Sequence, residues 1–153
     1  MKTPEFVIAD TSSLIVFKKI GRLELLQFVY SEITITSEVE SEYGETLPAW
    51  VRVENASNQE QQKFLEGELD TGEASSIALA MEYPDSLMIL DDLKARKVAR
   101  KFNLVFTGTL GVISKARAEG YLNELKPIID QILETNFRIS DQVIRALLSK
   151  HEE

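Results

Sequence analysis

The decisive stretch of this sequence reads Phe6-Val7-Ile8-Ala9-Asp10-Thr11-Ser12-Ser13. A short apolar run that ends in a carboxylate is typical of a strand buried on both faces of a parallel sheet. The hydroxyl residues that follow favour the start of a helix. Because ligands of open parallel sheets bind at the carboxyl ends of the strands, Asp10 is either part of a functional site or only the cap of the next helix.

The composition excludes several kinds of catalytic site. The chain has no cysteine and a single histidine, His151, close to its C-terminal end. Disulfides, thiolate metal sites and cysteine nucleophiles are therefore excluded, and a histidine triad or zinc site is not expected at a frayed end. Any catalysis must rest on carboxylates, hydroxyls, lysine, arginine or tyrosine.

Hydropathy and charge narrow the class of protein further. With 153 residues, 44% of them hydrophobic, the chain predicts one globular domain, 1–153, with 121–153 a helical C-terminal extension packed on it. No apolar run approaches the ~20 residues of a membrane helix, and residues 1–5 leave no room for a signal peptide. We therefore expect a cytoplasmic protein with no membrane partner. The net charge of -8 argues against a general nucleic-acid binder, but not against a nuclease whose acidic pocket is neutralised by divalent ions.

Strand and helix patterns alternate along the remaining chain. Short apolar or β-branched runs predict further strands near 32–35, 50–53, 86–90 and 104–106. Amphipathic periodicity predicts helices near 13–19, 23–29, 37–43, 59–66, 69–81, 95–102, 109–119, 125–134 and 140–149. This alternation predicts the α/β class with a parallel sheet.

The helix near 37–43 contains an informative carboxylate. Ser37 and Glu40 have the spacing of a capping box, which gives Glu40 a structural role. Helical phase places Glu42 on the same face as the apolar Val39 and Tyr43. A carboxylate that points inward is costly unless it is paired or binds a metal, so Glu42 is the candidate catalytic residue of this helix.

The helix that opens at 69–74 holds a further acid. Asp70 is a good N-cap and Glu73 lies three residues later, so capping explains both residues on local grounds and leaves a catalytic role of Glu73 open. Gly72 is harder to explain, because glycine in a first turn costs stability. Its presence predicts that another group closely approaches the backbone there.

A later apolar run ends in two acids, Asp91 and Asp92. If this strand is the neighbour of the one before Asp10, their ends lie ~5 Å apart. Carboxylates that close repel one another unless cations lie between them, and Mg²⁺ and Mn²⁺ prefer such hard oxygen ligands. Together with Glu42 and Glu73, these acids predict phosphodiester hydrolysis by metal-activated water.

The helix that follows Asp92 is strongly basic. Its apolar face holds Ala95, Val98, Ala99 and Phe102, and its other faces carry Lys94, Arg96, Lys97, Arg100 and Lys101. These cations form either a solvated face or a set of phosphate contacts beside the acidic site. In the second case Lys94, Arg96 and Arg100 are the candidate RNA-binding residues.

Four motifs, taken in order, resemble those of the PIN-domain ribonucleases. They are Val7-Ile8-Ala9-Asp10-Thr11-Ser12, Val39-Glu40-Ser41-Glu42, Gly72-Glu73-Ala74 and Ile89-Leu90-Asp91-Asp92. The likeness covers essentially the whole chain and is closest to the VapC-like toxin branch of bacteria and archaea. Two further stretches resemble an uncharacterised subfamily of that branch: Leu90-Asp91-Asp92-x-Lys94-Ala95-Arg96 and Thr107-Gly108-Thr109-Leu110-Gly111.

This resemblance implies a PIN-like sheet of about five parallel strands flanked by helices, and RNA cleavage that depends on Mg²⁺ or Mn²⁺. It also implies a cognate antitoxin as partner. Because the exposed helices offer surfaces for pairing, we expect either that antitoxin or an identical subunit in a homodimer to cover the active edge. The implied acids are Asp10, Glu42, Glu73 and either Asp91 or Asp92, with Asp10, Glu73, Asp91 and Asp92 as metal ligands. Leu90 stands where family members often have a hydroxyl residue, and Thr107 or Thr109 could replace it. Thr11 and Ser12 are further supporting residues.

Three other classes of protein fit part of the pattern. A receiver-type signalling domain has paired acids after its first strand, whereas here the pair follows a later strand. A phosphatase of the haloacid-dehalogenase type needs a second aspartate where this chain has Ser12. A non-enzymatic interaction module of the same fold accords with the acidic net charge, although all the acid positions are filled.

Overall fold

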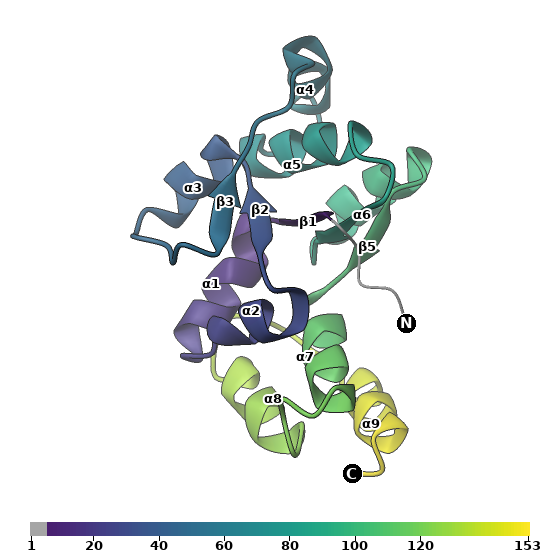
Figure 1. The fold of residues 1–153 in the computed structure, drawn as a ribbon. Coiled ribbons are helices and arrows are strands. Elements are labelled where there is room, and N and C mark those ends of the chain that lie inside the picture. Colours follow the sequence, from purple (N-terminus) through teal and green to yellow (C-terminus); the bar gives the residue numbers. More distant parts are fainter. Residues whose placement is uncertain (1–5) are drawn as a thin grey trace.

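The structure, a computed structural model, describes residues 6–153, so the expectation for residues 1–5 lies outside the described part. Five parallel strands form one sheet in the order β3-β2-β1-β4-β5. They are β1 (Phe6–Ala9), β2 (Ile33–Ile35), β3 (Val51–Val53), β4 (Ser86–Ile89) and β5 (Val105–Thr107). The predicted α/β class with a helix-flanked parallel sheet of five strands is confirmed (Figure 1).

The central strand β1 has a neighbour on each side. Ala9 pairs with Ile89 of β4, and Ile8 pairs with Thr34 of β2. The backbone N–H of Asp10 donates to the carbonyl of Ile89 at 3.1 Å. The expected adjacency of the two acid-terminated strands is therefore confirmed, and their carboxylates leave the sheet at the same edge.

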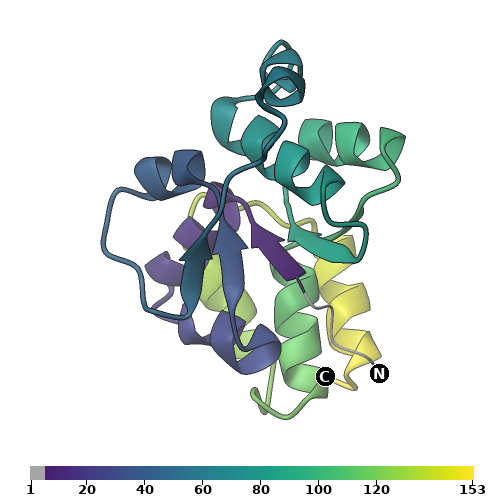
Figure 2. The same cartoon turned by 45° about the horizontal axis from the view of Figure 1, so that its top comes forward.

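Helices cover both faces of the sheet (Figures 1 and 2). One face packs on a core that includes Phe17, Leu25, Ile113 and Ile129. Its helices are α1 (Thr11–Lys19), α2 (Glu24–Tyr30), α7 (Thr109–Ala118), α8 (Lys126–Leu133) and α9 (Asp141–Lys150). The other face carries α5 (Thr71–Met81) and α6 (Leu93–Lys101), α4 (Gln59–Leu65) packs against α5, and α3 (Ser37–Tyr43) packs against α1 and α5.

The helix α5 is buried on every side rather than along one stripe. All residues from Gly72 to Ala80 are buried, because α5 is packed against the sheet, α3 and α4. A helix in this position needs small or apolar residues all round, which explains its run of alanines and serines. The N-terminus of α5 is thereby fixed firmly beside the edge of the sheet.

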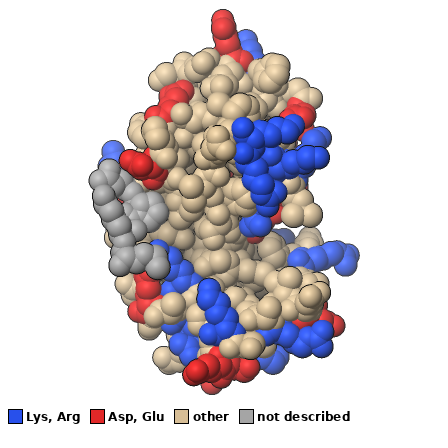
Figure 3. Space-filling model, turned by 90° about the vertical axis from the view of Figure 1, so that its right-hand side faces the viewer, with Lys and Arg blue, Asp and Glu red and all other residues tan. Residues whose placement is uncertain are grey.

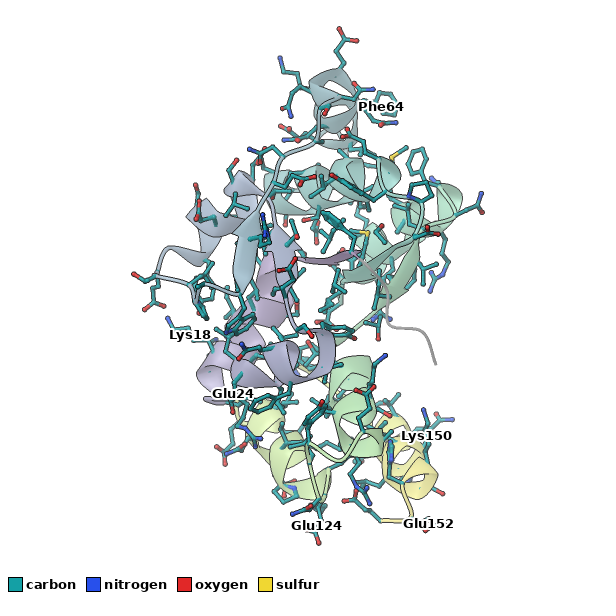
Figure 4. All side chains as sticks on the ribbon, in the orientation of Figure 1. Lys18, Glu24, Phe64, Glu124, Lys150 and Glu152 are labelled. Atoms are coloured by element: carbon teal, nitrogen blue, oxygen red, sulfur yellow. The ribbon has the colours of Figure 1, made fainter. Side chains whose placement is uncertain are left out.

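The C-terminal helices differ in how deeply they pack. Ile128, Ile129 and Ile132 of α8 are fully buried in the first core, whereas α9 has no buried residue and contributes half-buried Ile144 and Leu147. At the opposite end of the molecule α4 projects outward, and its Phe64 is 80% exposed (Figure 4). Among the described residues, no helix is long and apolar enough to span a lipid bilayer.

Two local predictions are wrong. The N-cap of α3 is Thr36, whose hydroxyl accepts from the backbone N–H of Val39 at 3.2 Å, and Ser37 is already helical. The capping box therefore does not form, and Glu40 is exposed at the surface. Phe102, predicted to be buried, is 37% exposed, because α6 ends before it and Phe102 serves as the C-cap.

Candidate active site

The centre of the candidate site is Asp10, which follows β1 directly and is only 3% exposed. It occupies the N-cap position of α1, but its side chain makes no capping hydrogen bond. The alternative in which Asp10 is only a helix cap is therefore not supported. The pKa of Asp10 is raised to about 7, chiefly by burial; the charges of Asp70, Glu42 and Asp91 add to the increase, and the hydrogen bond from the backbone N–H of Thr11 opposes it.

Glu73 is the second buried acid at this edge. Burial raises its pKa to about 7, and the charges of Asp70, Asp10 and Asp92 add to the increase. Asp70 accepts from the backbone N–H of Glu73 at 2.8 Å, so the predicted cap of α5 is confirmed. Sequence reasoning assigned Asp70 only this capping role and missed its charge beside both buried acids.

Glu42 reaches the site from α3. Helical phase placed it on the inward side of α3, but the residue is exposed rather than buried. Nevertheless its Oε1 accepts a hydrogen bond from the hydroxyl of Thr11 at 2.5 Å. The carboxylate also lies so close to Gly72 that a Cβ atom there would collide with it. The predicted close approach to the backbone of Gly72 is thus confirmed, and the approaching group is Glu42.

The two consecutive acids after β4 have different surroundings. Asp91 accepts from the backbone N–H of Thr109 at 2.8 Å and from its hydroxyl at 2.6 Å. Asp92 is exposed and caps α6 by accepting from the N–H of Ala95 at 2.9 Å. The negative charge of Asp91 contributes to the raised pKa of Asp10, and that of Asp92 contributes to the raised pKa of Glu73. Both acids therefore border the site.

The hydroxyl residues named from the sequence are not equivalent. Thr11 and Thr109 each donate to a carboxylate of the site, Glu42 and Asp91 respectively. Thr107 lies with its hydroxyl against Gly111 instead, and Ser12 is exposed. Of the two threonines considered as substitutes for the hydroxyl missing at position 90, Thr109 is the one that reaches an acid.

The basic helix α6 is not a uniform solvated face. Arg96 turns back toward the sheet, where its Nε donates to the carbonyl of Leu90 at 2.6 Å and its Nη2 lies 4.0 Å from Asp91. Its guanidinium carbon lies 5.0 Å from the centre of the Phe106 ring, and that of Arg100 lies 5.1 Å from it. Lys94 is exposed. Figure 3 shows the basic side chains of α6 gathered above a hollow.

The acids fit a divalent metal by their chemistry but not by a ready-made cluster. Over residues 6–153, no group of three or more acidic or histidine side chains is arranged to hold an ion. The available donors are carboxylate oxygens, the ligands that Mg²⁺ and Mn²⁺ prefer. The raised pKa values of Asp10 and Glu73 report crowded negative charge, which a bound cation would neutralise.

A helix-flanked parallel sheet with carboxylates at its carboxyl edge defines a class of α/β domain with an acidic site. A family model described as PIN domain matches residues 6–153, and the chain belongs to the PIN-domain family. Comparisons with the curated proteins and with the solved structures find no match. PIN domains are generally nucleases and typically use divalent metals, so membership supports nuclease activity and sets aside the receiver-type alternative.

Proposed function

We propose that this protein is an endoribonuclease that depends on Mg²⁺ or Mn²⁺. One observation carries the proposal: Asp10 and Glu73, from distant parts of the chain, are both buried at one edge of the sheet, with pKa values raised to about 7. Burying ionisable groups among other acids costs free energy of folding. Strongly perturbed carboxyls in such a place are typical of functional sites.

Asp10, Glu73, Asp91 and Asp92 are the proposed metal ligands. When bound, the ion supplies an activated water and neutralises charge on the phosphodiester. The Thr109 N–H and hydroxyl orient Asp91 through two hydrogen bonds.

Glu42 is the proposed proton acceptor of the site. Its Oε1 is engaged by the Thr11 hydroxyl, which orients the carboxylate toward the edge where Asp10 lies. Oε2 is then the atom that takes a proton from water. Because Glu42 is exposed, it can pass that proton to solvent. Lys94, Arg96 and Arg100 of α6 are the proposed contacts to RNA phosphates.

A cleavage assay tests this function. Purified protein is incubated with single-stranded RNA in Mn²⁺, in Mg²⁺ and in EDTA, and the fragments are resolved by length. Cleavage is expected only with metal, and Asp10→Asn should abolish it because that change keeps the shape and removes one charge. The control Asp85→Asn removes an exposed acid of the loop before β4 and should cleave like wild type. Cutting by clean Asp10→Asn protein, or equal cutting in EDTA, would contradict the proposal.

We further propose that a partner silences the enzyme in the cytoplasm, as in a toxin–antitoxin pair, or that a second copy covers it. Exposed apolar side chains beside the acids support this proposal, because a bound partner would shield them from water. Leu93, which directly follows Asp92, is 80% exposed. Light scattering on the purified protein, and recovery of bound partners from the native host, test this. A strict monomer that recovers no partner would count against it.

The second candidate function is a non-enzymatic interaction module with the same fold. The lack of a preformed ion cluster in the described part of the chain favours it, as does the net charge of -8. Such a module would neither cleave RNA nor change its melting temperature with Mn²⁺. The cleavage assay and a thermal-shift series in Mn²⁺ therefore separate the two candidates.

A further inference from the structure

A cleft of about 500 Å³ opens beside the acidic edge. Its lining comes from three places: α6 and β5 supply Leu93, Arg96 and Phe106, the start of α7 supplies Leu110, and the C-terminal part supplies residues 137–140 together with Val143 of α9. The volume lies within the range of small-molecule pockets. The hollow below the basic side chains in Figure 3 lies on this face.

The cleft is continuous with the candidate active site through Asp91. This residue lines the cleft, contributes to the raised pKa of Asp10, and is held by the first residue of α7, Thr109. A strand whose phosphate lies at the acids would therefore have a neighbouring nucleotide at the cleft.

The polar lining suits an anion even though the whole chain is acidic. Among the residues that line the cleft, Arg96 and Arg138 are cationic and Asp91 is the one carboxylate. Asp91 already receives two hydrogen bonds from Thr109. Arg96 uses its Nε on the Leu90 carbonyl, and its Nη2 is 4.0 Å from Asp91, too far for a hydrogen bond. Its Nη hydrogens are thus available to a phosphate.

The apolar lining suits a flat ring. Leu93, Phe106, Phe137, Ile139 and Val143 contribute to it, and Leu93 and Val143 are 80% and 45% exposed. Unpaired bases stack on aromatic rings and on guanidinium planes. The cleft offers both kinds of group, the Phe137 ring and the guanidinium of Arg96, which itself lies over the Phe106 ring. A stacked base would remove the exposed apolar surface from water.

We propose that this cleft binds one unstacked nucleotide of the RNA strand, next to the phosphate at the acids. Its base packs on the apolar lining, and its phosphate contacts Arg96 and Arg138. The proposal rests on the proposed ribonuclease function and deepens it: the substrate is single-stranded at this position, because a base held in a duplex cannot enter the cleft.

A scan with abasic nucleotides tests the proposal. The protein carries Asp10→Asn to prevent cleavage, and a short single-stranded RNA with one base removed at each position in turn is titrated by fluorescence anisotropy. Removing the base that occupies the cleft should weaken binding roughly 10-fold, the size of a lost base–aromatic stack. Removing bases outside the footprint should have no effect.

Two cleft variants, each with a matched control, assign the effect to this site. Val143→Glu places a negative charge in the lining, and Gln142→Glu places the same charge on an exposed neighbour outside it. Arg138→Ala removes a lining cation, and Arg145→Ala removes an exposed cation of α9 outside the lining. With Val143→Glu, removing the base at the sensitive position should no longer weaken binding. Arg138→Ala should lower the slope of log affinity against log salt concentration by about one. Both control variants should behave like the Asp10→Asn protein that carries no further change.

The outcomes separate this proposal from the ribonuclease function. If the wild type cleaves RNA but no abasic position is sensitive, or the penalty persists in Val143→Glu, the cleft does not hold a base and the function stands. If the RNA is neither bound nor cleaved, both are overturned. Equal loss in Arg138→Ala and Arg145→Ala would show that only general charge matters, which also overturns the cleft.

Discussion

Neutralising Asp10 should stabilise the metal-free protein, and the gain should depend on pH. In the folded state the pKa of Asp10 is raised from 3.8 to about 7, chiefly by burial. The folded protein therefore holds this proton over a range where the unfolded chain has released it. Below pH about 4 both states are protonated and there is no penalty. As pH rises from about 4 to about 7, wild type loses stability, and above pH 7 the loss is constant.

The size of the effect follows from the two pKa values. A difference of about three units, at 1.36 kcal/mol per unit, gives about 4 kcal/mol at pH 8. Asp10→Asn keeps the shape of the side chain and removes the charge, so its free energy of unfolding should exceed that of wild type by about this amount at pH 8. At pH 4 the two proteins should unfold alike.

The measurement is urea unfolding of both proteins from pH 4 to pH 8 in EDTA, followed by the same series in Mn²⁺. A ligand that binds only the folded state adds RT ln(1 + [L]/Kd), roughly 2.7 kcal/mol at a hundredfold excess over Kd. Wild type should gain this from Mn²⁺ and Asp10→Asn should gain much less, so the stability difference at pH 8 should shrink or reverse.

The control for this series is Asp85→Asn, which changes the net charge equally at an exposed position and should follow wild type throughout. Parallel pH curves for wild type and Asp10→Asn would refute the account of a buried, uncompensated carboxyl. If in addition neither protein responded to Mn²⁺, the acids would not be a metal site, and the interaction module would become the better description.

Three further predictions concern positions around the site and the core. Glu42→Gln should lower cleavage on the order of 100-fold, as for loss of a general base, while Glu40→Gln, at an exposed position, should cleave like wild type; equal losses would show that the two roles are misassigned. Gly72→Ala should reduce cleavage, because the new Cβ displaces the Glu42 carboxylate, yet raise stability by up to about 1 kcal/mol, since alanine favours the helix; parallel rate assays and melts check this, and unchanged cleavage would contradict it. Ile132→Ala should cost about 2–5 kcal/mol in urea unfolding because Ile132 is fully buried, and the adjacent Leu133→Ala, at a side chain 42% exposed, should cost under about 1 kcal/mol; equal costs would place α8 outside the core.

The sequence pattern predicted the centre of the sheet well because β2, β1 and β4 are mostly buried. Such strands read as short apolar runs; the run at 6–9 ends directly in Asp10, and the run at 86–89 is followed by Leu90 and then by Asp91. The sequence did not show that these two strands are neighbours, because strand order depends on contacts between distant segments. The closeness of their acids could therefore be predicted only on the assumption that the strands pair. The pattern indicated five strand segments, the number that the family resemblance also implies, and the pairing of Ala9 with Ile89 confirmed that the two acid-bearing strands are neighbours.

The site was harder to predict in detail, for local reasons. A helix cap is the last residue that is still extended, and sequence spacing alone did not show that this was Thr36 rather than Ser37. Helical phase gave the direction of Glu42 but not its exposure, because α3 packs against α1 and α5 with only a narrow apolar face. The charge of Asp70 beside Asp10 arises from the fold of α5 onto the sheet, which no local pattern contains.

The strand order has a consequence for how the chain is synthesised. The central strand β1 leaves the ribosome before the other strands of the sheet, but its partner β4 follows only after β2, β3 and five helices. Chains are synthesised at about 5–20 residues per second, and domains generally fold as units. Until β4 emerges, one edge of β1 has no hydrogen-bonding partner and can associate with other chains. Asp10 and Glu42 are therefore made long before Asp91 and Asp92 can join them. The proposed ribonuclease would therefore lack part of its acidic site, and could not cut the messenger RNA from which it is being translated, until Asp91 and Asp92 had been made.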